Sequence, residues 1–214
     1  MNALVFAPHN DDEVLGVGGT ICKLADAGHF VTVCEVTSGP KYKMMQEEAG
    51  NAHRKLGVKK SIFLNLPFVR LKFTETAQIN KEISAVIDDV RPETVFMPFI
   101  WDLHLDHREV TESVLVAVRP MNGCPVRTVY MYETLSETGW NIPSAERSFI
   151  PDTWVDISAY IDRKIEAMQC YGSQIKTYPN PRSAEGIKAL AMYRGATAGL
   201  AYAESFMTVR NIII

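Results

Sequence analysis

The stretch Leu4-Val5-Phe6-Ala7-Pro8-His9-Asn10-Asp11-Asp12-Glu13 decides how the rest of this 214-residue chain is interpreted. Its apolar beginning, residues 3–7, predicts a buried strand that ends at Pro8, and the apolar, glycine-bearing segment that follows predicts a helix. Open α/β sheets bind ligands just beyond the carboxyl ends of their strands. Because three adjacent acids at such a point repel one another, we expect a divalent metal ion to offset their charge.

The alternation of strand and helix continues through the first half of the chain, where β-prone runs are followed by segments with helical periodicity. This alternation predicts an α/β, Rossmann-like fold, in which helices cover both faces of a mostly parallel sheet. The length predicts one domain, residues 1–214. The predicted strands are 30–37, 60–64, 94–98, 126–132 and the short extended segment 151–155, and the predicted helices are 14–27, 41–56, 79–90, 110–118, 157–171 and about 185–206.

The first predicted helix contains Gly16-Val17-Gly18-Gly19 in its first turns. The full GxGxxG spacing of a dinucleotide-binding loop is missing, so we interpret these glycines as positions where the helix packs closely on the sheet. Asn10 is expected in the turn. His29 and His53 lie in polar segments without partner residues, and we expect both at the surface.

The composition, with 47% apolar and 22% charged residues, predicts an ordinary soluble globular protein. A net charge of -3 argues against binding to nucleic acid or to an anionic membrane. We expect no signal peptide and no membrane span, because no apolar stretch approaches the ~20 residues that a span needs. Cys22 and Cys34 are expected as buried free thiols, which favours a cytoplasmic, reducing location. The apolar segment 209–214 predicts an added strand or a contact with another subunit, hence a homo-oligomer.

A second polar cluster, residues 101–109, follows the predicted strand 94–98. Because the ends of parallel strands meet at one edge of a sheet, we expect both clusters to form one site. Imidazole and carboxylate groups without thiolate suit a catalytic zinc ion held by three protein ligands, although another divalent metal also fits. The residues that the two clusters offer are His9, Asp11, Asp12, His104, Asp106 and His107.

Three ligands leave a carboxylate and an imidazole for catalysis, as amide hydrolysis requires. The carboxylate would take a proton from metal-bound water, whose pKa the metal lowers toward ~7, and the imidazole would stabilise the oxyanion or protonate the departing amine. Each motif alone also has a structural explanation, since Asp11-Asp12-Glu13 fits helix capping and residues 104–107 fit a solvated loop. Their joint occurrence at two strand ends favours a functional site.

Pro8-His9-Asn10-Asp11-Asp12-Glu13 and His104-Leu105-Asp106-His107 resemble the two signature motifs of the PIG-L/LmbE-like N-deacetylases. The resemblance implies a Rossmann-like fold and zinc-dependent removal of an acetyl group from an N-acetylglucosamine-type substrate. It implies His9, Asp12 and His107 as metal ligands. It also implies Asp11 as the general base, His104 as the oxyanion-facing residue and Asp106 as a supporting carboxylate. Later segments, among them 132–134, 171–174 and 202–206, resemble the family's closing blocks.

Met45 stands where the family commonly has an arginine that contacts the sugar, whereas Glu48 and Leu56-Gly57 follow the family pattern. Two alternatives therefore stay open: a metal-dependent hydrolase of another small N-acyl amide, and a sugar- or nucleotide-binding module without catalysis. Lys41, Lys43 or Arg70 can supply a replacement cation. The further candidates for substrate contact are Arg70, Arg194 and Glu204.

Overall fold

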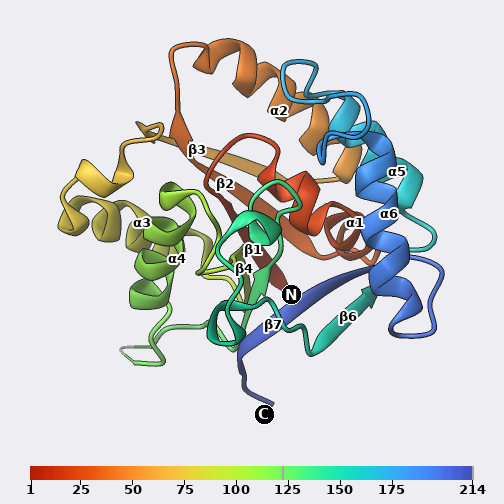
Figure 1. Ribbon diagram of the computed structural model, residues 1–214. Coiled ribbons are helices and arrows are strands. Elements are labelled where there is room, and N and C mark those ends of the chain that lie inside the picture. Colours follow the sequence, from red (N-terminus) through yellow and green to blue (C-terminus); the bar gives the residue numbers. More distant parts are fainter. Residues whose placement is uncertain (122, 214) are drawn as a thin grey trace.

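The computed structural model describes residues 1–121 and 123–213. Within these residues a sheet of seven strands runs in the order β3-β2-β1-β4-β5-β7-β6 (Figure 1). The strands β1 to β5 are parallel to one another, whereas β7 is antiparallel to both of its neighbours. The strands are β1 (Asn2–Ala7), β2 (Phe30–Ser38), β3 (Lys60–Pro67), β4 (Thr94–Pro98), β5 (Thr128–Tyr132), β6 (Thr153–Asp156) and β7 (Ala203–Asn211).

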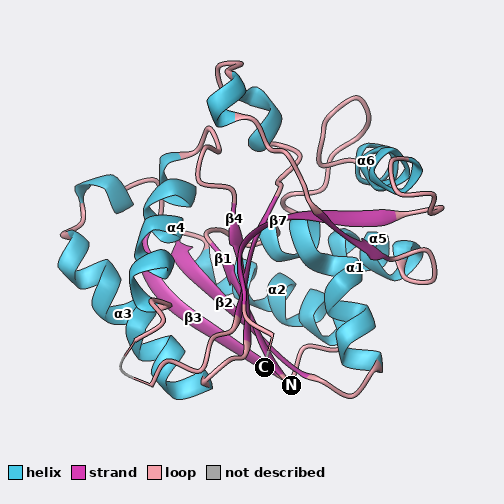
Figure 2. Cartoon of the chain, turned by 90° about the horizontal axis from the view of Figure 1, so that it is seen from below, coloured by secondary structure: helices cyan, strands magenta, loops and turns pink. Residues whose placement is uncertain are grey.

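Helices cover both faces of the sheet, as Figure 2 shows, so the predicted α/β, Rossmann-like architecture is confirmed. The α-helices are α1 (Asp12–Asp26), α2 (Tyr42–Leu56), α3 (Thr76–Val90), α4 (Leu105–Ala117), α5 (Ile161–Gln169) and α6 (Ala184–Ala196). Short 3-10 helices span Leu71–Phe73, Thr138–Trp140 and Ala145–Arg147. Across the described residues, no helix combines the length and the apolar character that crossing a bilayer requires.

Strand β1 lies at the centre of the sheet and is buried on both faces from Ala3 to Ala7. Its alternate side chains enter two separate apolar cores. Val5 packs with α1, α2 and α5, and Phe6 packs with α3 and α4 on the opposite face. A strand covered on both sides needs a continuous apolar run, which explains why this stretch lacks the alternation of a half-exposed strand.

The strand order reverses at β1, because β2 lies on one side of it and β4 on the other. The chain leaves β1 toward α1 on one face, and it leaves β4 toward α4 on the other. A crevice opens where two such connections diverge, and ligands of open α/β sheets bind there. The two polar clusters of the sequence follow β1 and β4, so the topology itself brings them to one place.

Gly16 packs closely on the sheet, as the sequence predicted, whereas Gly18 and Gly19 pack closely on Lys164 and Ile157, which lie outside the sheet. A Cβ atom at Gly16 would overlap with the ring of Tyr132 on β5, and one at Gly19 would lie 2.7 Å from Ile157 Cγ2. The Tyr132 ring cannot move away freely, since its hydroxyl donates to Phe6 O at 2.8 Å. The prediction of buried free thiols is also confirmed. Cys22 and Cys34 are both buried and unpaired, and burial raises the pKa of Cys22 to about 12.

The predicted helix 185–206 is wrong over its second half. Helix α6 ends at Ala196, and the chain continues as the strand β7, Ala203–Asn211. At Gly195 a Cβ would lie 2.6 Å from Leu200 O, so this glycine allows the chain to fold back on the helix end. Strand β7 then fills the place between β5 and β6. Residues 209–211 belong to β7, as one reading of the apolar end predicted, and residue 214 lies outside the described residues.

We expect Gly16→Ala to lower the free energy of unfolding by about 1–3 kcal/mol, because the added methyl group overpacks against Tyr132. The matched control is Gly50→Ala in α2, where the new Cβ would meet only Arg54 Nη1 at 3.7 Å. Gly50→Ala should raise the free energy of unfolding by up to about 1 kcal/mol, because alanine has the higher helix propensity. Urea denaturation followed by circular dichroism measures the free energy of unfolding of both variants. A change of the same sign in the two variants would contradict the packing argument.

Candidate metal centre and active site

Three potential metal ligands from two distant segments converge beyond the ends of β1 and β4. Asp12 Oδ2 lies 3.5 Å from His9 Nδ1 and 3.1 Å from His107 Nε2, and the two ring nitrogens are 3.3 Å apart. His107 and Asp12 are fully buried, and His9 is 9% exposed. Ligands of a tetrahedral zinc ion, with bonds of about 2.0–2.1 Å, lie about 3.3 Å apart. The three atoms therefore already have the spacing of a metal site.

The hydrogen bonds of the two rings favour a cation at the centre of this triangle. His107 Nδ1 contacts Asp102 Oδ2 at 2.8 Å, and His9 Nε2 contacts Asp106 Oδ2 at 3.2 Å. Since a carboxylate only accepts, each of these nitrogens is the donor, and in a neutral ring the other nitrogen carries a lone pair. With both rings neutral, two lone pairs would face the Asp12 carboxylate within 3.5 Å. A divalent ion would turn this repulsion into coordination, so the donor set fits a metal.

The pKa shifts of His107 and Asp12 also indicate that a positive charge is favoured at this point. Burial by itself would lower the pKa of His107, but the charge of Asp12 and the hydrogen bonds to Asp102 and Asp12 raise it well above its ordinary value. Burial would raise the pKa of Asp12, yet His107 and His9 hold it well below its usual range. A positive charge is therefore strongly favoured between these side chains, whether a proton or a metal ion carries it.

Asp102 was missed by the sequence interpretation, which named Asp106 as the supporting carboxylate. Its Oδ2 atom orients the His107 ring, and its Oδ1 atom accepts from Thr138 Oγ1 at 2.6 Å. Asp102 is fully buried, and burial raises its pKa although the bond from His107 opposes the shift. It stands five residues before His107 in a loop, a spacing that carries no recognisable signal in the sequence.

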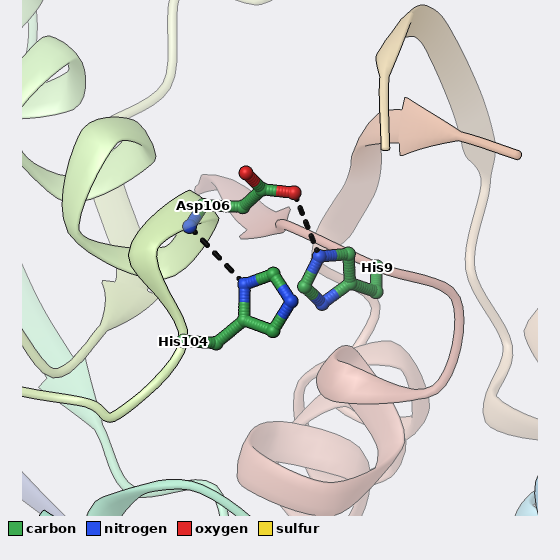
Figure 3. A group of neighbouring side chains, drawn as sticks. All are labelled: His9, His104 and Asp106. Carbon is green, nitrogen blue, oxygen red and sulfur yellow. Dashed lines mark hydrogen bonds and ion pairs between the residues drawn. The ribbon is translucent and has the colours of Figure 1, made fainter. Parts of the chain in front are cut away.

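His104 and Asp106 lie beside His9 (Figure 3). His104 Nδ1 accepts from the backbone N–H of Asp106 at 3.1 Å, so in the neutral ring the hydrogen is on Nε2. Burial, and next the charge of His9, lower the pKa of His104 to about 4. His104 is therefore a neutral donor at neutral pH.

Asp106 ties this centre to the segment that follows β3. Its carboxylate accepts from the backbone N–H of Val69 at 2.7 Å and of Leu71 at 3.1 Å, besides His9. Val69 has a φ of 61°, which is strained for a β-branched residue and is stabilised here by the bond to Asp106. The lone pairs of Asp106 are thus largely used, which makes it a poor metal ligand although it lies near His9 and His104.

Asp11 is fully buried, and neither of its carboxylate oxygens has a hydrogen-bond partner among the described residues. Its φ of 102° is unusual for a residue other than glycine, and it occupies the N-cap position of α1. Burial raises its pKa well above the ordinary value, and the nearby Arg182, with Nε 3.4 Å from Oδ2, opposes that shift. Arg182 was not among the residues that the sequence singled out, since it lies 171 positions away in a loop.

The three residues predicted to contact substrate occupy different surroundings. Arg70 is exposed in the segment held by Asp106. Arg194 donates from Nε and Nη2 to the two oxygens of Glu133, both at 2.7 Å. Glu204 is buried on β7, where it accepts from Lys164 Nζ at 2.6 Å and from the N–H groups of Gly19 and Thr20. The last two residues therefore use their charges within the protein, and substrate contact by any of the three stays a prediction.

The prediction of a surface position for His53 is wrong, because the side chain is only 2% exposed. His53 Nε2 lies 3.5 Å from Glu13 Oε1 and 3.5 Å from Glu35 Oε1, and Nδ1 lies 2.7 Å from Ser61 Oγ. Tyr171 donates to Glu13 at 2.7 Å and lies between the two carboxylates. Asn10, in the predicted turn, donates to Glu35. This buried network anchors the turn that carries His9 and Asp11.

Comparisons with known proteins agree with this site. The profile of the family described as PIG-L: GlcNAc-PI de-N-acetylase matches residues 4–118, slightly more than half of the chain. The diacetylchitobiose deacetylase of Thermococcus kodakarensis is 29% identical over 99% of this chain and 84% of its own length. A probable N-acetyl-alpha-D-glucosaminyl L-malate deacetylase 2 of Bacillus cereus is 27% identical over 81% of this chain and 83% of its own.

Among solved structures, the conserved protein TT1542 of Thermus thermophilus has a TM-score of 0.81 and 27% identity. The match covers 99% of this chain and 96% of that one. The fold and the site thus define a protein with a group of side chains that could hold a metal ion at the switch point of an α/β sheet. The chain belongs to the PIG-L family, as the two motifs predicted, and its relatives include deacetylases of N-acetylated sugars.

We expect Asp102→Asn to weaken metal binding by about 10–100-fold, because the neutral amide no longer favours the hydrogen on His107 Nδ1. The control is Asp88→Asn, an exposed carboxylate on α3, which should leave the affinity unchanged. Competition with a chromogenic chelator measures zinc affinity in each variant. Equal affinity in Asp102→Asn and the parent protein would show that this contact does not orient a metal ligand.

Proposed function

We propose that this protein is a zinc-dependent hydrolase that removes the acetyl group from an N-acetylglucosamine-type sugar or conjugate. One observation carries the proposal: His9, Asp12 and His107 bring three potential ligand atoms to one point, beside the buried carboxylate of Asp11, which accepts no hydrogen bond from the described residues. A structural metal site would not need such a carboxylate. The deacetylase relatives support the class of reaction and the amino-sugar substrate.

The ligands in this proposal are His9 Nδ1, Asp12 Oδ2 and His107 Nε2. When bound there, a divalent ion would supply Lewis-acid chemistry, which makes water more acidic and polarises the amide carbonyl. Asp102 and Asp106 hold the two imidazole rings from outside, so both rings keep the lone pair that coordination needs. Zinc suits three nitrogen and oxygen ligands with an open position, and another divalent ion remains compatible with the same set.

Asp11 is the proposed general base, which accepts a proton from the attacking water. A carboxyl group is an effective base near neutral pH when its pKa is raised toward that pH, and burial raises the pKa of Asp11. The positive charge of Arg182, with Nε 3.4 Å from Asp11 Oδ2, opposes this rise and favours the ionised form that accepts the proton. The proton then passes to the departing amine, and the products are acetate and the free amino compound.

His104 is the proposed oxyanion donor. Its Nδ1 atom is occupied by the backbone N–H of Asp106, so Nε2–H is free to donate to the carbonyl oxygen as negative charge develops. The low pKa of about 4 keeps the His104 ring neutral at neutral pH. Nε2–H therefore donates a hydrogen bond without placing a second positive charge beside the proposed metal ion. In this scheme Asp106 acts through His9 and through its own backbone N–H, as a positioning residue.

The other readings of the sequence differ from this one in measurable ways. A binding module without catalysis would not need an unpartnered base or a neutral imidazole donor, which is why we prefer an enzyme. A hydrolase of a different N-acyl amide would use the same chemistry with another specificity. We also propose a cytoplasmic location, since Cys22 and Cys34 are free thiols, and a homo-oligomer, since Ile213 is 89% exposed beyond β7.

Asp11→Asn should reduce deacetylation about 10²–10⁴-fold while the metal content stays near that of the parent protein. Asparagine is the appropriate replacement, because it tolerates the positive φ of this position and removes only the basic oxygen. Acetate release from N-acetylglucosamine and diacetylchitobiose gives the activity, and elemental analysis gives the metal. Unchanged turnover in this variant would exclude Asp11 as the base.

Removal of the metal is the complementary test. Dialysis against a chelator should abolish acetate release, and one equivalent of zinc per chain should restore it. His107→Ala should lose both the metal and the activity, since it removes a ligand from the triangle. Full activity of the chelated protein would contradict the proposed use of a metal. A chelated protein that still binds sugars, but never releases acetate with zinc present, would indicate the binding module.

A further inference from the structure

A cavity of about 300 Å³ opens directly beside His9 and lies between α2 and the segment after β3. We call it the Met45–Phe68 pocket, after the two large apolar residues in its wall. Gly39 and Pro40, which connect β2 to α2, also line it. The volume is at the lower end of the range for small-molecule sites, and it is much larger than the methyl group of an acetyl substituent needs.

The polar groups in this wall are largely engaged with other protein atoms. Asn10 donates to Glu35, and Thr37 Oγ1 donates to Pro8 O at 2.8 Å. Gln174 Nε2 donates to Ser173 Oγ, and its Oε1 accepts from Arg182 Nη1. A sugar ring brings several hydroxyl groups, each of which loses water on entry and needs a new partner. Apart from Lys41 at the exposed edge, the wall offers few free partners, so it suits an apolar group.

The pocket has a fixed position relative to the metal centre. The Phe68 ring contacts the His9 ring edge-on, with centroids 5.0 Å apart and planes at 77°. The next residue, Val69, is held by Asp106, whose carboxylate also bonds His9. Met45 forms another part of the wall and has a flexible side chain that adapts to the shape of an apolar ligand. A group inside the pocket therefore lies next to His9, within a few bonds of an amide bound at the centre.

We propose that the Met45–Phe68 pocket selects substrates that carry an apolar group adjacent to the hydrolysed amide. This inference rests on the proposed amide hydrolysis and refines its substrate class. The apolar group has two possible sources: an acyl chain longer than acetyl, or an aryl or alkyl substituent on the amine portion. The chemistry that the wall recognises is the same in both cases, and the substrates below distinguish them.

The first experiment compares kcat/KM for three substrates of the zinc-loaded protein: N-acetylglucosamine, N-hexanoylglucosamine and phenyl N-acetyl-β-glucosaminide. We expect at least one apolar substrate to exceed N-acetylglucosamine about 10–200-fold, the range that an apolar pocket provides. Preference for the hexanoyl compound assigns the pocket to the acyl chain, and preference for the phenyl compound assigns it to the amine portion. A value for N-acetylglucosamine equal to or above both would overturn the proposal.

Met45→Gln tests the wall, because it keeps the length of the side chain and adds a polar amide. It should reduce kcat/KM for the apolar substrate about tenfold more than kcat/KM for N-acetylglucosamine, mainly through KM. The control is Met44→Gln, since Met44 is 41% exposed and does not line the pocket. Equal losses for the apolar and the plain substrate in Met45→Gln would contradict a specificity role.

Binding measurements separate this inference from the proposed reaction. Phenyl β-glucosaminide, the amine that deacetylation would release, is titrated into the protein by calorimetry, with glucosamine as the reference. The phenyl compound should bind at least tenfold more tightly, with a negative heat-capacity change that Met45→Gln reduces. If both amines bind equally and N-hexanoylglucosamine binds no better than N-acetylglucosamine, the pocket proposal fails. If apolar ligands bind well but nothing is hydrolysed, only the proposed function fails.

Discussion

The convergence of three potential ligand atoms on one point is the constraint on which the rest of this structure depends. His9 Nδ1, Asp12 Oδ2 and His107 Nε2 lie within 3.5 Å of one another, in a setting that is almost completely buried. Neither ring can turn away, since the remaining nitrogen of each donates to a carboxylate of its own. A positive charge relieves this arrangement, and the position of β1 beside β4 brings the three ligand atoms together.

Asp106 connects the proposed metal centre to the Met45–Phe68 pocket. It bonds His9, it fixes the backbone of Val69 and Leu71, and its own N–H fixes the tautomer of His104. Asp106 thereby sets the orientation of His9, of His104 and of the segment that carries Phe68. Under the two proposals, wall residues such as Met45 can change the specificity while the proposed metal ligands stay as they are. This protein can therefore share the proposed reaction with its relatives and still act on a different substrate.

The sequence predicted the four strands β1 to β4 and the helices between them with small errors at the ends, because buried parallel strands leave continuous apolar runs. It predicted residues 203–206 of β7 wrongly as helix, because they pair with β5 and β6 from other parts of the chain, and such pairing leaves no periodic signal. His53 was misplaced for a similar reason. Its neighbours on α2 are polar, but Glu13 and Glu35 approach it from two other elements.

By itself, the sequence determined the order of the first strands and helices, the membership of the PIG-L family and the set of histidines and aspartates beyond β1 and β4. These features depend on residue type and short-range spacing, which the linear chain contains in full. Only the tertiary structure decided that Asp102 orients His107, that Arg182 faces Asp11 and that the Met45–Phe68 pocket opens beside His9. Each of these depends on distances between atoms of separate elements or loops, and packing alone sets such distances.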